Sequence, residues 1–180
     1  MDPSPTPGIA GGEIPSTSIP LPQPHELTQR EKDDALAAYL MNFAAWGAGL
    51  PLPTLNLIAA WVYYFLNRRK SRFVAFHCFQ ACTSQIPTTV INMIAVGLVV
   101  DYTFILHRGL PHFFWPYVGF AVLTNLLYLA SSIYACVMAA KGRFHYFLVF
   151  GRWAYARYYG PNAISLDGGV APRNLPPTGF

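Results

Sequence analysis

Three side chains that commonly bind metal ions lie close together in the sequence, namely His77, Cys78 and Cys82. On a helix, Cys78 and Cys82 would share one face, whereas His77 would lie about 100° round the axis from Cys78. A protein metal site needs three or four convergent ligands, and the sequence offers no obvious further ligand. We therefore expect these residues, and Cys136 in a later apolar run, to be packing residues, and we expect no cofactor.

Polar residues continue along the same segment as Gln85, Thr88 and Asn92. Their i, i+3, i+7 spacing would place them on one side of a helix, where they extend Cys78 and Cys82 into a mildly polar stripe. Such a stripe can line a water-filled path, but residues of these types more often form hydrogen bonds between helices. We favour the packing role and keep the pore as the alternative.

The common catalytic motifs that we sought are missing. The sequence contains no GxSxG, HExxH, GxGxxG or CxxC pattern and no phosphate-binding P-loop. Asp101 is the single acidic residue between Asp34 and Asp167, so the helical region has no pair of carboxylates for acid and base catalysis. We therefore expect no enzymatic activity.

The composition points to a membrane rather than to water. Of the 180 residues, 53% are hydrophobic and 11% are charged, which is too apolar for a typical soluble domain of this size. The net charge of +4 comes from basic residues that flank apolar runs, and this placement is typical of membrane orientation signals. We expect one integral membrane domain that contacts the lipid bilayer and binds no nucleic acid.

The apolar runs predict an all-α fold, a polytopic transmembrane helical bundle. Two short helices over 35–50 and 54–66 would be separated by prolines, and Thr28 with Glu31 would cap the first of them. An upright crossing needs about 20 residues, so each short helix falls below that length. The pair would form either a re-entrant hairpin or two short crossings.

Two long helices would follow. The first, over 73–106, would be about 51 Å long, which exceeds the hydrocarbon core of a bilayer. We divide it at Pro87 into a semi-polar entry segment and a crossing over 88–106, which places Asp101 near the far interface. The second, over 113–140, begins with a cluster of aromatic residues, as expected at the level of the lipid headgroups.

These elements divide the chain into a proline-rich tail over 1–26, a transmembrane domain over 27–143, a basic and aromatic segment over 144–159 on the membrane surface, and an irregular tail over 160–180. The basic loop after the second short helix contains Arg68, Arg69, Lys70 and Arg72. The positive-inside rule places this loop and both termini in the cytoplasm and leaves Arg108 on the other side.

One face of the last long helix carries small residues at helical spacing. This small-residue face consists of Ser131, Ser132, Ala135, Cys136 and Ala139. Small side chains let two helix backbones approach closely, so the face should contact another helix, either in the same chain or in a partner. A similar surface on the first helix consists of Ala44, Ala45, Ala48 and Gly49.

The segment RFVAFHCFQA carries an FVxFHxxQA core directly after the basic loop. Together with LTQREKDDALAAYL, WVYYFLNRRK and AAKGRFHYF, it resembles an uncharacterised bacterial membrane-protein family related to the Tic-type import subunit of the chloroplast inner envelope. The resemblance covers about residues 27–147 and implies importance for Phe73, Phe76, His77, Gln80 and Ala81. Among these, His77 and Gln80 lie on one helical face, where they could form hydrogen bonds between helices.

The resemblance implies a non-enzymatic membrane protein. We favour an accessory or structural subunit of a larger membrane complex, such as an energy-transducing one, in a bacterial inner membrane, with other membrane-protein subunits as partners. The few polar groups in the spans, the small-residue face and the two tails favour this hypothesis. A Tic-type protein-translocation or channel component is the alternative.

Overall fold

The computed structural model describes residues 19–43 and 53–160, and these residues contain helices and no strands. In chain order the elements are α1 (Gln29–Leu40), the 3-10 helix η1 (Met41–Phe43), α3 (Pro53–Asn67), α4 (Arg72–Val100), the π-helical turn η2 (Asp101–Ile105), α5 (Phe114–Ala140) and α6 (Phe150–Tyr158). The expected all-α class is confirmed for the described part of the chain.

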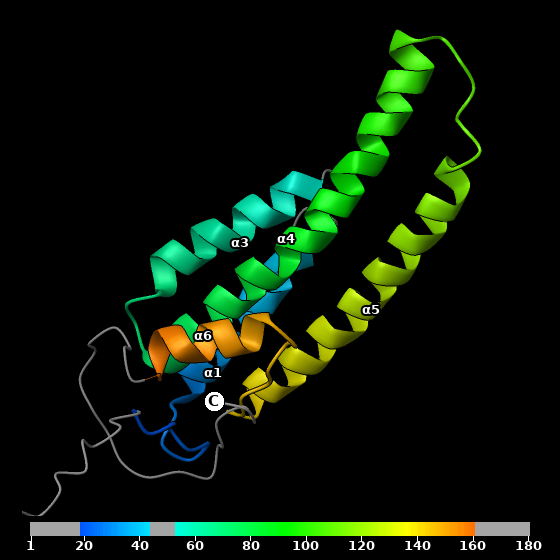
Figure 1. The fold of residues 1–180 in the computed structure, drawn as a ribbon. Helices are drawn as coiled ribbons and strands as arrows, with labels where there is room; N and C mark the ends of the chain where they lie inside the picture. The colour runs from blue at the N-terminus through cyan, green and yellow to red at the C-terminus, as the bar shows by residue number, and fades with distance from the viewer. Residues whose placement is uncertain (1–18, 44–52, 161–180) are drawn as a thin grey trace, which may run out of the picture.

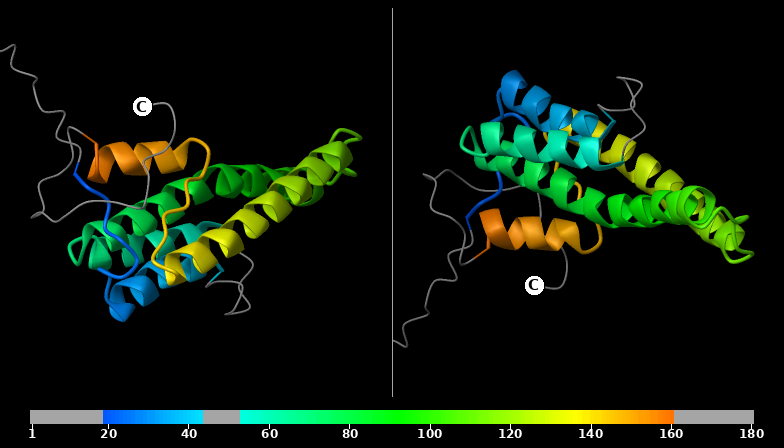
Figure 2. Two further views of the ribbon diagram at one scale, coloured as in Figure 1. Left: turned by 90° about the horizontal axis from the view of Figure 1, so that it is seen from below. Right: turned by 90° about the horizontal axis from the view of Figure 1, so that it is seen from above.

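The central element of the fold is α4 (Figure 1). Its first half contacts α1, α3, α5 and α6, and every side chain from Phe73 to Gln85 is buried. Helices α1 and α3 lie on one side of α4, and α6 lies on the opposite side (Figure 2). We call the packed part of the molecule, which consists of residues 19–43, 53–89 and 130–160, the base.

The rest of α4 and the first part of α5 extend beyond the base as a pair of helices (Figure 1). We call residues 90–129 the hairpin. Large apolar side chains face outward on both of its helices, as Ile94, Phe104 and Leu127 show. The segments Arg72–Ile105 and Phe114–Ala140 are the two described helices that are long and apolar enough to cross a membrane. An apolar surface of this extent suits lipid rather than water.

The helix ends follow from local sequence. Thr28 and Glu31 form the predicted capping box, in which the Thr28 hydroxyl accepts from the Glu31 N–H and the Glu31 carboxylate accepts from the Thr28 N–H at 2.9 Å. Helix α5 ends in a Schellman motif, because Gly142 has a φ of +68° and the N–H of Arg143 donates to the carbonyl of Met138. The expected end of the last long helix is thus confirmed.

One expectation about the spans changes. The division at Pro87 is not seen, since α4 continues through it as one helix whose buried face packs on four neighbouring helices. The two long elements have the length and composition of a span. Of the two short elements, α3 has 15 residues, and the expected helix over 35–50 is described only to residue 43, where α1 and η1 form its first part. The proline-containing link 44–52, with the small surface of Ala44, Ala45, Ala48 and Gly49, lies outside the described residues.

The end of the expected N-terminal tail belongs to the base. Leu21 and Gln23 are buried, and the N–H of Ile19 donates to the carbonyl of Tyr159 at 3.2 Å. The remainder of that tail and residues 161–180 of the C-terminal tail lie outside the described residues. The segment 19–26 is irregular, as its prolines predict, but it covers the base.

Candidate functional site

The FVxFHxxQA core of α4 lies in the middle of the base. The five residues that the resemblance singles out are buried, at exposed fractions of 0 or 1%, and are Phe73, Phe76, His77, Gln80 and Ala81. Of these, His77 and Gln80 contact α1 through Tyr39, which is itself completely buried. Hydrogen bonds between helices are therefore present at the two positions where the sequence favours them. We call Tyr39, His77 and Gln80 the polar centre.

Hydrogen bonds connect the three side chains of the polar centre to one another and to the connector before α6. The side-chain nitrogen of Gln80 donates to the backbone carbonyl of His145 at 2.8 Å and to the Tyr39 hydroxyl at 2.9 Å. The same Tyr39 hydroxyl lies 2.9 Å from Nδ1 of His77 and is hydrogen-bonded to it, with donor and acceptor set by the tautomer of the imidazole. Burial raises the pKa of Tyr39 well above its usual value, which keeps the phenol protonated.

An aromatic shell surrounds the His77 ring. Phe73 and Phe76 meet it edge to face, at 4.5 and 5.1 Å between ring centroids, and Phe144 stacks on it at 5.6 Å. Ring pairs with this geometry add to the stabilisation from burial. Phe144 comes from the connector between α5 and α6, so the shell fastens that connector to α4.

The polar centre joins α1, α4 and the connector before α6. Among the described residues, no three His, Cys, Asp or Glu side chains gather as a metal site, and Cys78 and Cys82 are buried free thiols. Nε2 of His77 and Oε1 of Gln80 have no hydrogen-bond partner among the described residues. The arrangement can fix α1, α4 and the connector in one register, and this is the role that its geometry supports.

The small-residue face of α5 packs inside the chain. Its buried members are Ser132, Ala135, Cys136 and Ala139, while Ser131 is partly buried. The thiol of Cys136 lies 3.7 Å from the backbone carbonyl of Leu36 in α1 and donates to it. The expected helix partner of this face is therefore α1 of the same chain, so the face is not available to another subunit.

The polar stripe of α4 is hydrogen-bonded within the chain. The Gln85 side chain donates to the carbonyl of Asn42 in η1 at 3.5 Å, and the Thr88 hydroxyl donates to the Gln85 carbonyl of α4 itself at 2.9 Å. In the hairpin, Asn92 and Asn125 exchange two hydrogen bonds between α4 and α5, at 3.0 and 2.8 Å. These contacts support the packing role of the stripe over a pore.

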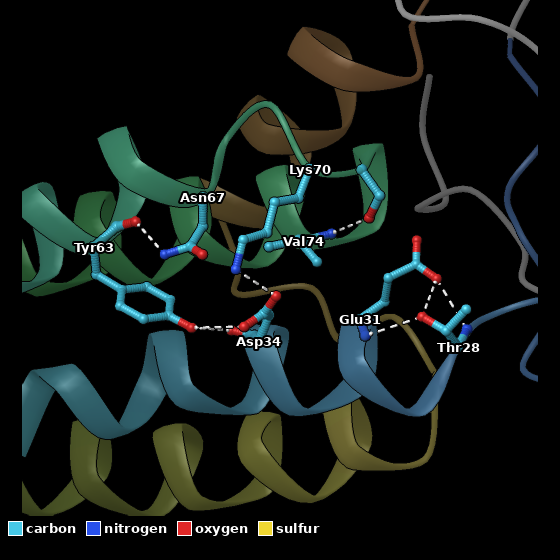
Figure 3. A network of polar contacts seen from close by, with 8 residues as sticks. Thr28, Glu31, Asp34, Tyr63, Asn67, Lys70 and Val74 are labelled. Atoms are coloured by element: carbon cyan, nitrogen blue, oxygen red, sulfur yellow. Dashed lines mark hydrogen bonds and ion pairs between the residues drawn. The ribbon is translucent and has the colours of Figure 1, made fainter.

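The basic loop ties α3 and α4 to neighbouring helices (Figure 3). Lys70 forms an ion pair with Asp34 of α1 at 2.8 Å, and the Tyr63 hydroxyl donates to the Asp34 carbonyl at 3.0 Å. The guanidinium of Arg72 donates to the carbonyl of Tyr158 at the end of α6. The remaining members of the loop are Arg68, which is partly buried, and Arg69, which is exposed.

The tip of the hairpin, residues 101–113, has backbone features that sequence patterns do not reveal. A π-helical turn follows α4, and His107 has a φ of +47°, in the left-handed region. Few residues other than glycine adopt that region, and histidine is among those that do so most readily. Asp101, His107 and His112 are exposed there. The one feature of the sequence that draws attention to this tip is Asp101, the single acidic residue between Asp34 and Asp167.

A comparison with protein families identifies the chain. Residues 33–154 match the model of the MamF/MmsF family, which is described as a magnetosome magnetite crystal formation protein family. The match covers more than half of the chain and runs from α1 into α6, so it includes the polar centre and the whole hairpin. Comparisons with curated proteins and with solved structures found no match.

The family match overturns the resemblance to the Tic-type import family. The FVxFHxxQA core fills the packed centre of a helix, where side-chain size and a few hydrogen bonds determine the residues, so this short pattern does not identify a function. The match to the magnetosome family still supports the expectation of a bacterial membrane protein, and the two apolar helices agree with it. The chain belongs to the magnetosome magnetite crystal formation protein family.

Proposed function

We propose that this protein is an integral protein of the magnetosome membrane that takes part in magnetite crystal formation as a structural component, without enzymatic chemistry. The family match over residues 33–154 carries the proposal. The hairpin supports the membrane placement, because apolar side chains cover its outer surface. The missing catalytic motifs support the non-enzymatic role.

The distribution of charge supports one orientation of the protein in the membrane. The base carries the basic loop together with Lys141 and Arg143, whereas Arg108 is the single lysine or arginine of the hairpin tip. By the positive-inside rule, the base and both termini would face the cytoplasm. The tip would then face the interior of the magnetosome.

In this orientation the hairpin tip is the part of the described chain that can meet the growing mineral. It exposes Asp101, His107 and His112, and carboxylate and imidazole groups are ordinary ligands of iron ions. These side chains do not gather into a metal-binding cluster in the described structure. The tip therefore suits weak contact with iron ions or with an iron oxide surface rather than a closed metal centre.

The proposal can be tested by gene replacement in a magnetite-forming bacterium, followed by electron microscopy of the crystals. The triple variant Asp101→Asn, His107→Asn, His112→Asn removes the charge and the imidazoles of the tip, and asparagine tolerates the positive φ of His107. We expect smaller or less regular crystals with an unchanged amount of protein in the membrane.

Arg69→Gln is the matched control, because it changes an exposed charge at the opposite end of the molecule. It should leave the crystals as they are in the parent strain. Unchanged crystals in the tip variant would refute the mineral-facing role of the tip. Unchanged crystals in a strain that lacks the protein would refute the proposed function as a whole.

Membership of a larger complex needs a separate test. The small-residue face is occupied by α1, so a partner would contact the outer surface of the hairpin or of the base. Extraction in mild detergent, native-size separation and mass spectrometry would identify such partners. Co-migration with the same proteins at a constant ratio supports a subunit, and migration alone or as a small homo-oligomer contradicts it.

A further inference from the structure

Helix α6 and the connector before it present an outer surface that is strongly apolar. Leu148 is 95% exposed, Val149 is 68% exposed and Trp153 is 52% exposed. The opposite face of α6 is buried against α4. Three large apolar side chains on the outside of an amphipathic segment are the arrangement found where a helix lies in a membrane interface.

The same segment is basic. It carries four exposed basic residues, which we call the basic rim: Lys141, Arg143, Arg152 and Arg157. No acidic residue lies between 102 and 166 to compensate their charge within the segment. The guanidinium of Arg157 also lies over the Phe79 ring, 5.1 Å from its centroid. Exposed apolar residues with a basic rim complement the headgroup layer of an anionic membrane.

The attachment of α6 to the base holds this surface in one orientation. Gly151 packs directly on the connector, where a Cβ atom would lie 2.6 Å from Cα of Tyr146. At the other end of α6, the hydroxyls of Tyr158 and Tyr64 are hydrogen-bonded at 2.8 Å, and Arg72 donates to the Tyr158 carbonyl. Because both ends are fastened and the buried face of α6 packs on α4, the exposed apolar side chains stay on the side away from α4, the helix that enters the membrane.

We propose that α6 and its connector form a fixed membrane anchor. Leu148, Val149 and Trp153 enter the headgroup layer of the cytoplasmic leaflet, and the basic rim binds anionic phospholipid headgroups. The inference rests on the membrane placement proposed above and deepens it by naming the class of lipid. Charge complementarity and continuity with the two spans favour lipid over a protein partner on this surface.

The test uses the full-length protein in vesicles of phosphatidylcholine, with or without phosphatidylglycerol. Lipids brominated near the headgroup quench tryptophans within the membrane interface. The signal of Trp153 is the difference between the wild-type protein and Trp153→Phe. In the wild-type protein the Trp153 and Phe79 rings lie 4.9 Å apart between centroids, and phenylalanine keeps an aromatic ring at this position. We expect clear quenching of Trp153, stronger with phosphatidylglycerol and weaker at high salt, with little quenching by aqueous iodide.

Trp115, which is exposed at the start of α5, provides the internal control through Trp115→Phe. Quenching of Trp115 but not of Trp153 would overturn the anchor and leave the membrane placement standing. Quenching of neither residue would refute the membrane placement and the anchor together. If both bromolipid and iodide fail to reach Trp153, a protein covers the surface and the lipid proposal is wrong.

Charge variants test the lipid class independently. Arg143→Gln with Arg152→Gln should remove the stronger quenching of Trp153 in phosphatidylglycerol vesicles. Arg69→Gln, an equally exposed charge in the basic loop, should preserve it. An unchanged phosphatidylglycerol preference in the double variant would overturn the role of the basic rim.

Discussion

Replacing Tyr39 by phenylalanine removes one oxygen atom from the polar centre and leaves the ring in place. The loss deprives Nδ1 of His77 of its partner, while Gln80 keeps its hydrogen bond to the His145 carbonyl. An unpaired polar atom in a buried site costs about 1–3 kcal/mol, and the second lost hydrogen bond adds about 1 kcal/mol. We expect Tyr39→Phe to lower the free energy of unfolding by about 2–4 kcal/mol.

Tyr159 offers a matched control for this substitution. It is also completely buried, but its hydroxyl has no hydrogen-bond partner among the described residues. Tyr159→Phe therefore removes a polar group that is desolvated without compensation. We expect this variant to be as stable as the wild-type protein or slightly more stable, although the change in side-chain volume is the same.

The labelling rate of buried thiols provides the assay. Cys78 and Cys82 lie on α4 beside the polar centre and are about 1% exposed, so a thiol reagent reaches them only when the base opens. A loss of about 2 kcal/mol corresponds to about a 30-fold larger open population and labelling rate. Equal labelling rates in Tyr39→Phe and Tyr159→Phe would refute the hydrogen-bond argument and leave ring packing as the source of stability.

Three further expectations concern other contacts. Asn92→Leu should cost about 1 kcal/mol in detergent unfolding, and adding Asn125→Leu should recover part of that loss, because the second change removes the amide oxygen that the first leaves without a donor. Ala135→Leu should lower the unfolding temperature through overpacking against α1; unchanged stability with loss of a partner protein would contradict the intramolecular contact. Burial lowers the pKa of His145, so the unfolded chain takes up a proton below about pH 6.5 before the folded chain does. Stability should therefore fall as the pH drops through that range, and His145→Gln should reduce this dependence.

The parts of the fold that sequence predicts are those that local geometry determines. The cap at Thr28 and Glu31 involves residues three positions apart, and the end of α5 depends on the positive φ of Gly142 and its two neighbours. The π-helical turn over Asp101–Ile105 is equally local, but no residue type demands it, so nothing in the sequence marks it.

The partners of the site residues lie too far away in sequence to be predicted. Tyr39 and His77 are 38 positions apart, and the small-residue face of α5 meets Leu36 across 100 positions. Helical periodicity predicts which face of a helix is packed, but it does not predict which helix packs there. The resemblance to the Tic-type import family is wrong for a related reason. A short apolar pattern such as FVxFHxxQA is determined by the packing of a helix and does not identify a function.

The two halves of α4 divide stability and function between them. From Phe73 to Thr89, buried hydroxyls of α4 donate to carbonyls of the same helix. The buried side chains of His77, Gln80 and Gln85 are instead hydrogen-bonded to other segments, which makes the register of the base specific. Beyond Val90 the side chains are mainly apolar and face outward, so lipid can solvate the hairpin with little demand for specific partners. It follows that substitutions at the polar centre should change how firmly the hairpin is held, whereas substitutions at Asp101 and its neighbours should change what the tip binds without changing stability.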